Sequence, residues 1–122
     1  MEINASPLQG DRQLRLAVDQ HHRPAEVTFS GTVASEPVYF HSTRSGLTHE
    51  AFDVRTPSGL RAQVVENVDV GPRVPVHRGD AVTVRGEYVR DAGATHVVHW
   101  THHDPSGRHA GGFIEAGGRR YA

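Results

Sequence analysis

Apolar residues that alternate with polar ones constrain this chain more than any other feature. In the stretch that starts at Glu26, Val27 and Phe29 fall on one face, and Thr28 and Ser30 fall on the other. A period of two is typical of a β-strand with one buried face. The same alternation predicts five short strands, at residues 26–33, 49–55, 60–67, 82–88 and 95–101.

Turns and glycines predict how these strands are arranged. Thr56-Pro57-Ser58-Gly59 carries proline at the second position of a turn, so the second and third strands should form a hairpin. Asp91-Ala92-Gly93 should join the fourth and fifth strands in the same way. Gly31 and Gly86 fall inside the first and fourth strands, where a small barrel bends sharply. These features predict a mainly β fold, a small five-stranded OB-like barrel.

Two segments that carry no long alternation are predicted to connect strands. A loop should run through Glu36-Pro37 and Ser42 to Gly46, between the first two strands. Gly71-Pro72 and Pro75 interrupt the chain after the third strand, so we expect an irregular link there.

The N-terminal segment has the signals of a helix. Asp11 is placed to cap a short helix, and Leu14, Val18 and His21 would lie on one stripe of it. Pro24 should stop this helix. We expect the helix to pack beside the barrel.

The C-terminal segment is predicted to be a loose tail. Gly111-Gly112 and Gly117-Gly118 weaken regular structure there, and Phe113, Ile114 and Tyr121 should tie the tail back to the barrel. We therefore expect one domain over residues 1–122. It would comprise a helical segment at 1–24, the barrel at 25–101, and a His-rich turn and tail at 102–122.

Composition narrows the chemistry open to this chain. Cysteine is absent, which excludes disulfides, thiolate metal sites and cysteine nucleophiles. All 13 basic residues are arginine, which excludes lysine Schiff-base chemistry and favours binding of phosphate or carboxylate. The net charge is only -1 at pH 7, so any anion site must be local. There is no long apolar run and no secretory signal, so we expect a soluble, cytoplasmic protein.

Residues 99–109 concentrate side chains that bind a metal, transfer a proton or hold an anion. Asp104-Pro105-Ser106-Gly107 has the composition of a tight turn, which should fold Arg108 and His109 back toward His102 and His103. We predict a site for a divalent metal such as zinc, held by His102, His103 and His109, with His49 or Glu66 joining from neighbouring strands. The alternative is a hydrogen-bonded histidine cluster that only fixes the turn.

Several shorter motifs accompany this segment. They are Gly31-Thr32-Val33, His49 with Phe52, Asn67 through Val74, Gly79-Asp80, Gly86-Glu87-Tyr88 and Gly112-Phe113-Ile114. With these motifs and the string from His99 to His109, the chain resembles an uncharacterised bacterial family, a domain of unknown function with an OB-like fold. The resemblance runs from about Leu14 to Tyr121. The resemblance implies a shared fold and a shared site, but it implies no activity. It also implies that relatives carry histidine at the position of Glu66 in this chain.

Small barrels of this kind bind single-stranded nucleic acid by stacking bases on aromatic side chains over a basic groove. The outward-facing residues suited to this are Tyr39, Phe40 and Trp100 as platforms, with Arg55, Arg61 and Arg85 as a basic stripe. Our leading hypothesis is a non-catalytic OB-like module that holds a nucleic acid, a nucleotide or another phosphate-bearing ligand. The predicted ligand-binding residues are His49, Asn67, Asp69, Arg73, His99, Trp100 and Arg108.

Two other functions are open. A metal-dependent phosphodiesterase or nuclease would use His102 or His103 as a general base, with Asp104 orienting the base. In that case Arg73 or Arg108 would stabilise a phosphoryl group. A structural or interaction domain would instead use the ten histidines as a pH switch, because imidazole titrates near pH ~6.5.

Overall fold

The computed structural model describes residues 10–20, 24–90, 96–108 and 111–122. Within these ranges, one helix, α2 (Arg12–Asp19), precedes the strands. The chain then forms β1 (Ala25–Val33), β2 (Val38–His41), β3 (Thr48–Arg55), β4 (Arg61–Asn67), β5 (Ala81–Arg90), β6 (His96–His99), β7 (Phe113–Ala116) and β8 (Arg119–Tyr121).

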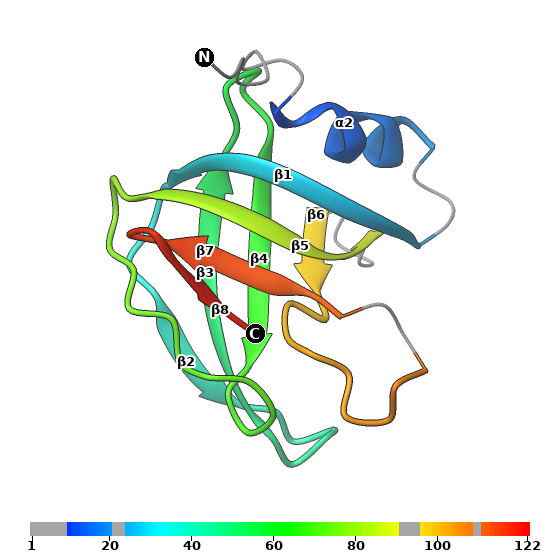
Figure 1. Ribbon diagram of the computed structural model, residues 1–122, viewed down its shortest axis with the longest axis vertical. Coiled ribbons are helices and arrows are strands. Elements are labelled where there is room, and N and C mark those ends of the chain that lie inside the picture. The colour runs from blue at the N-terminus through cyan, green and yellow to red at the C-terminus, as the bar shows by residue number, and fades with distance from the viewer. Residues whose placement is uncertain (1–9, 21–23, 91–95, 109–110) are drawn as a thin grey trace.

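Five of these strands close into a barrel. The ring runs from β1 to β3, β4, β6 and β5 and returns to β1 (Figure 1). Neighbouring strands in the ring are antiparallel except β4 and β6, which are parallel. Outside the ring, β2 pairs with β3, and the β7–β8 hairpin pairs with β5. The predicted class is confirmed: a mainly β fold on a five-stranded barrel, with an N-terminal helix and a C-terminal segment packed on it.

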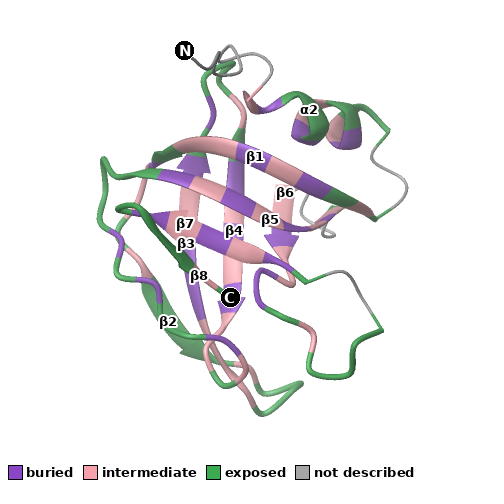
Figure 2. Cartoon of the chain, viewed as in Figure 1, coloured by how far each residue is buried: buried purple, intermediate pink, exposed green. Residues whose placement is uncertain are grey.

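The core fills the inside of the barrel with residues of one parity from each strand. On β1, Val27 and Phe29 are at most 2% exposed, and on β5 the side chains of Val84 and Tyr88 are completely buried. Figure 2 shows this as buried segments that alternate with partly exposed ones along β1 and β5. The alternation in the sequence therefore placed the core residues of these strands correctly.

Gly31 and Gly86 lie where neighbouring strands approach too closely for a side chain. A Cβ atom at Gly31 would stand 2.5 Å from the carbonyl oxygen of Arg55. A Cβ atom at Gly86 would collide with the carbonyl oxygen of His99. The two glycines permit the sharp bends that close the barrel, as predicted.

Helix α2 begins directly after Asp11, as predicted, but the Asp11 side chain does not cap the helix. Asp11 is fully buried and accepts a hydrogen bond from the Ser58 hydroxyl in the β3–β4 turn, which attaches the helix to the barrel. Leu14 and Ala17 are the buried helix residues, and Val18 packs against the core at its margin. Among the described residues no helix is both long and apolar enough to cross a membrane.

Two segments predicted to be irregular are strands. The loop expected from Glu36 to Gly46 contains β2, which pairs with β3 along its whole length. The expected loose tail is the β7–β8 hairpin, and Ile114 is fully buried in the core. Gly117 and Gly118, both at positive φ, form its two-residue turn, so the glycine pair marked a hairpin. In addition, β6 ends at His99, two residues before the predicted end at Thr101.

Candidate functional site

A pocket of about 390 Å³ opens on the outer face of the barrel across β3, β4 and β6. Its polar lining is His49 of β3, Asn67 of β4, His99 of β6, and Trp100 and His102 after β6. Leu47, Val65, Val70 and Pro105 supply the apolar wall. We call this site the Trp100 pocket. It lies at the end of the β3–β4 hairpin opposite the end that helix α2 covers (Figure 1).

Trp100 has a backbone conformation that side chains rarely adopt. Its φ is 57°, and it is the one non-glycine residue with positive φ among those described. Gly112 packs so closely against the Trp100 carbonyl that a Cβ atom there would collide with it, and the Gly112 N–H donates to the His102 carbonyl at 2.8 Å. Strain of this kind persists where the surrounding structure holds it, and it clusters at functional sites. It turns the chain sharply at the end of β6 and places the indole in the pocket.

The imidazoles of the pocket are held in different ways. His102 is 5% exposed, and its Nδ1 lies 2.6 Å from the His103 carbonyl. Because a carbonyl only accepts, Nδ1 carries the proton, and Nε2 is the acceptor of the neutral ring. The Nε2 atom of His99 lies 3.1 Å from Glu87. His49 stacks on Phe40 with ring centroids 5.3 Å apart.

One polar atom at this pocket lacks a partner. Nδ1 of His49 is buried and forms no hydrogen bond within the described part of the chain. Buried polar atoms in folded proteins are nearly always paired, so an unpaired one at a pocket wall points to a ligand or to water. The pocket therefore offers ring faces, an amide and an unpaired imidazole nitrogen.

The turn after His102 forms as predicted, and polar groups of the turn form hydrogen bonds with one another. Asp104 accepts hydrogen bonds from the backbone N–H groups of Ser106 and Arg108, at 3.0 and 2.8 Å, and from the Ser106 hydroxyl. These bonds make Asp104 the first residue of the turn, and none of them reaches His102 or His103. His103 is exposed, Arg108 does not line the pocket, and His109 lies outside the described residues, as do His21 and Asp91-Ala92-Gly93.

Two other predicted ligand residues lie elsewhere. Asp69 accepts a hydrogen bond from the Thr48 N–H at 2.8 Å and fixes the link after β4 to the start of β3. Arg73 lies over the ring of Tyr39, 4.8 Å from its centroid, and lines a different groove. Of the seven predicted ligand-binding residues, the pocket brings together His49, Asn67, His99 and Trp100.

Among the described residues, two carboxyl groups besides that of Asp11 are fully buried, and their burial was not predicted. Glu50 of β3 and Glu66 of β4 are directly opposite in the strand register, and both are fully buried. The sequence did contain a signal for their burial, because side chains two residues apart in a strand lie on the same face. Glu50 thus shares a face with Phe52, and Glu66 shares a face with Val64. Glu50 accepts from the Val74 N–H at 2.8 Å and from the Tyr39 hydroxyl at 3.2 Å.

Glu66 lies behind the Trp100 pocket and favours its neutral form. Burial raises its pKa to about 8, against the hydrogen bonds from Thr101 and from the Asn67 backbone, and the charge of Glu50 raises it further. Its Oε2 has no partner among the described residues and packs against Gly71, where a Cβ atom would stand 2.5 Å away.

The Thr101 hydroxyl explains how Glu66 can keep its proton. This hydroxyl lies 3.0 Å from the Val65 carbonyl and 2.9 Å from Oε1 of Glu66. A hydroxyl has one proton and cannot fully serve both acceptors. A protonated Glu66 would donate to Thr101, which would then donate to Val65.

The metal site stays a prediction, because His109, one of its three predicted ligands, lies outside the described residues. No three His, Asp or Glu side chains within the described ranges are placed to hold one ion. The rings of His102 and His103 meet edge to face, with centroids 6.3 Å apart and planes at 79°. The side chains that fit a ligand role best are His102, through Nε2, and His49, through its unpaired nitrogen.

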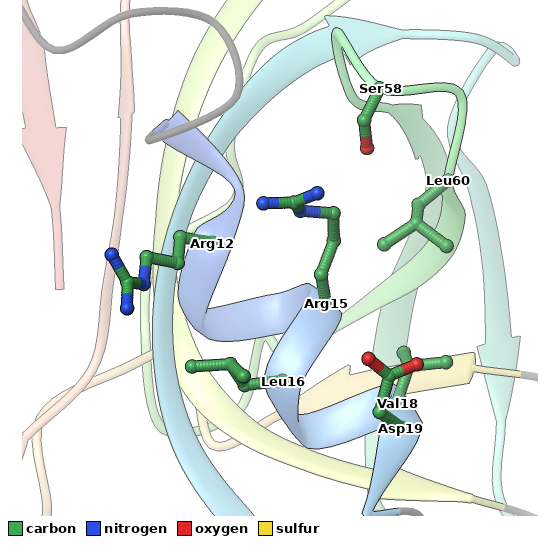
Figure 3. A pocket seen from close by; sticks show the side chains of 7 residues that line it. All are labelled: Arg12, Arg15, Leu16, Val18, Asp19, Ser58 and Leu60. Atoms are coloured by element: carbon green, nitrogen blue, oxygen red, sulfur yellow. The ribbon is translucent and has the colours of Figure 1, made fainter.

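A second pocket, of about 580 Å³, lies between α2 and the β3–β4 turn. Figure 3 shows the Arg15 side chain rising between the helix and the loop that carries Ser58 and Leu60. Arg15 pairs with the buried Asp11 at 3.4 Å. Burial alone would raise the pKa of Asp11, but the hydrogen bonds from Ser58 and Thr56 and the charge of Arg15 lower it. The polar groups here thus anchor the helix.

The fold and the Trp100 pocket define a small, mainly β barrel protein with an outer pocket lined by imidazole and indole rings. The chain belongs to the family described as Protein of unknown function (DUF3465), whose model matches residues 2–122. The predicted membership of an uncharacterised family is therefore confirmed. No curated protein matches the chain.

Proposed function

We propose that this protein is a binding module for single-stranded nucleic acid and that the Trp100 pocket receives a base. The observation that carries the proposal is the strained Trp100, held at φ 57° in a pocket with the rings of His49, His99 and His102. A flat aromatic base can stack on such rings, and the Asn67 amide can bond to its edge.

The position of the pocket supports the same function. Numbered along the chain, the ring strands have the order one, two, three, five, four, which resembles the OB-like barrel implied by the family resemblance. OB barrels bind oligonucleotides on the face of their second and third strands. In this chain those strands are β3 and β4, which carry His49, Val65 and Asn67 of the pocket. The likeness of fold is an analogy, and the ring-lined pocket is the independent support.

Two of the three arginines in the predicted basic stripe are paired with carboxylates, which offset their charge. Arg61 pairs with Asp53 at 2.9 Å, and Arg85 pairs with Glu26 at 3.2 Å. We therefore expect binding at the Trp100 pocket to depend on ring stacking more than on these arginines. Duplex DNA, whose bases are already stacked and paired, should bind more weakly than a single strand.

Trp100 also supplies the assay, because it is the single tryptophan of the chain. Titration with a short oligothymidylate at low salt should quench its fluorescence, and a labelled oligonucleotide should gain anisotropy. His49→Ala should weaken binding by about 5- to 150-fold, which corresponds to the usual loss of about 1 to 3 kcal/mol for one stacked base. His77→Ala is the matched control, because His77 is exposed and pairs with Glu36 away from the pocket. If single strands, duplexes and mononucleotides all leave the fluorescence and anisotropy unchanged, the proposal is wrong.

The divalent metal, the metal-dependent phosphodiesterase and the histidine pH switch stay predictions. Elemental analysis of protein purified without a histidine tag tests the metal directly. A metal held by His102 should be lost in His102→Ala and retained in His77→Ala. Phosphodiesterase activity should then disappear with a chelator and with His103→Ala.

A further inference from the structure

A groove of about 550 Å³ lies between β2, the link after β4, and β8. Figure 1 shows this link passing between β2 and the C-terminal hairpin. Three arginines and two tyrosines from these separate segments meet there. We call this site the arginine groove. Its arginines and tyrosines are Tyr39, Arg73, Arg119, Arg120 and Tyr121, and Pro72, Val74, Pro75 and Ala122 complete its lining.

The side-chain charges of the groove leave it positive. One carboxylate offsets the three guanidinium groups, because Glu115 pairs with Arg120 at 2.6 Å. The second nearby acid, Glu50, is fully buried under Tyr39, and burial raises its pKa, although hydrogen bonds from Val74 and Tyr39 and the charge of Arg73 oppose this. The groove therefore attracts anions in a protein whose net charge is -1.

Aromatic rings hold the guanidinium groups in place. Arg73 lies 4.8 Å from the Tyr39 ring centroid, and Arg119 lies 5.5 Å from that of Tyr121. A stacked guanidinium keeps its N–H edge free, and that edge matches the geometry of a phosphate. Arginines held in this way lose less side-chain entropy when they bind an anion.

A buried brace positions the Arg73 side of the groove. The Tyr39 hydroxyl donates to Glu50 at 3.2 Å, and the Val74 N–H donates to the other Glu50 oxygen at 2.8 Å. Glu50 thus joins β2 to the link, whose backbone is further restrained by Pro72 and Pro75. The groove is preorganised by the interior of the barrel.

The arginine groove and the Trp100 pocket lie on opposite sides of β2. Tyr39 and Phe40 are consecutive on this strand and face opposite sides. Phe40 stacks on His49 of the pocket, whereas Tyr39 lies under Arg73 of the groove. The link after β4 is shared as well, because Val70 lines the pocket and Arg73 lines the groove.

From this arrangement we infer that the arginine groove binds the phosphate backbone of the strand whose base occupies the Trp100 pocket. The inference rests on the proposed function and names the part of the ligand that the pocket leaves unbound. A nucleic acid that crosses β2 would place phosphates on Arg73 and Arg119 and a base beside Trp100. Sequence preference would come from the pocket, because phosphate contacts position a strand without reading it.

The salt dependence of oligonucleotide binding tests the inference. For the wild-type chain, the logarithm of the affinity for a labelled oligothymidylate is measured by anisotropy against the logarithm of the salt concentration. Each phosphate contact contributes about 0.7 to the slope for a single strand. Arg73→Gln and Arg119→Gln should each lower the slope by about 0.7 and weaken binding several-fold at low salt. Arg12→Gln, an exposed arginine of α2 outside both the groove and the Trp100 pocket, is the charge-matched control and should change neither quantity.

The outcomes separate the inference from the proposed function. Suppose that the oligonucleotide quenches Trp100 in the wild-type protein but both groove variants keep the wild-type slope. The groove then does not bind the backbone, and the proposal that the Trp100 pocket binds a base is unaffected. If the groove variants match Arg12→Gln in slope and affinity, the inference is likewise overturned. If no single strand binds the wild-type protein, the proposed function itself fails, and the inference fails with it.

Discussion

Replacing Glu66 with glutamine should remove a pH dependence of stability that the buried carboxyl group creates. In the unfolded chain this group titrates near its ordinary value of 4.5, and in the folded protein burial raises its pKa to about 8. Between these values the folded state binds a proton that the unfolded state does not bind. Stability must therefore fall as pH rises from about 4.5 to about 8 and level off above that range.

The size of this effect follows from the two pKa values. Each pH unit between 4.5 and about 8 corresponds to about 1.4 kcal/mol, so the upper limit is about 5 kcal/mol. The free energy of unfolding of a small domain is only about 5 to 15 kcal/mol, so a pH effect of even half the upper limit is easily measured. The unpaired Oε2 of Glu66, packed against Gly71, is the physical source of the cost of ionisation.

Urea unfolding of the wild type and of Glu66→Gln at pH values from 5 to 9 measures the effect. The histidines titrate in both proteins and cancel when the two free energies are subtracted. Glutamine is neutral and similar in shape, so the difference should grow in favour of the variant by several kcal/mol between pH 5 and pH 8.5, within the limit of about 5 kcal/mol. Glu26→Gln, an exposed partner of Arg85, is the control and should follow the wild type in slope. Parallel profiles for the wild type and Glu66→Gln would refute the reasoning.

Two further stability predictions follow from close contacts. Gly71→Ala should destabilise the protein by about 1 to 3 kcal/mol, because its Cβ atom would press on Glu66. In thermal unfolding, Gly71→Ala should have a lower melting temperature than the control Gly111→Ala, where a Cβ atom would make ordinary contacts. Equal melting temperatures would contradict the prediction. Ser58→Ala removes a hydrogen bond to the buried Asp11 and should cost about 1 to 3 kcal/mol at pH 7. The pKa of Asp11 is lowered, so this cost should shrink as pH falls below about 4, and urea titrations at pH 7 and pH 3 test whether it does.

The strands of the barrel could be predicted from the sequence because their signals are local. Alternation along β1 and β5 sorts each side chain to one face, whatever the strand pairs with. The turn at Thr56-Pro57-Ser58-Gly59 makes the hairpin of β3 and β4 through backbone preferences of four residues. β2 escaped prediction because four residues are too few to show a period, and its pairing with β3 is what makes it a strand.

The candidate site could be predicted only in part. Residues near His99 were identifiable from their chemistry, but strand register decided that His49 and Asn67 join them. The turn at Asp104 formed as its sequence indicates, and the Asp104 carboxylate accepts hydrogen bonds within that turn. Arg119 could not be placed, because its partners in the arginine groove come from β2 and from the link after β4.

The sequence by itself determined the strand faces, the main hairpin, the bends at Gly31 and Gly86 and the absence of cysteine chemistry. Tertiary structure alone decided that Glu50 and Glu66 lie side by side inside the barrel and that two different surfaces meet across β2. The physical reason is the range of the forces involved. Backbone preferences and alternation act over a few residues, whereas burial of a charge depends on which distant strands close around it.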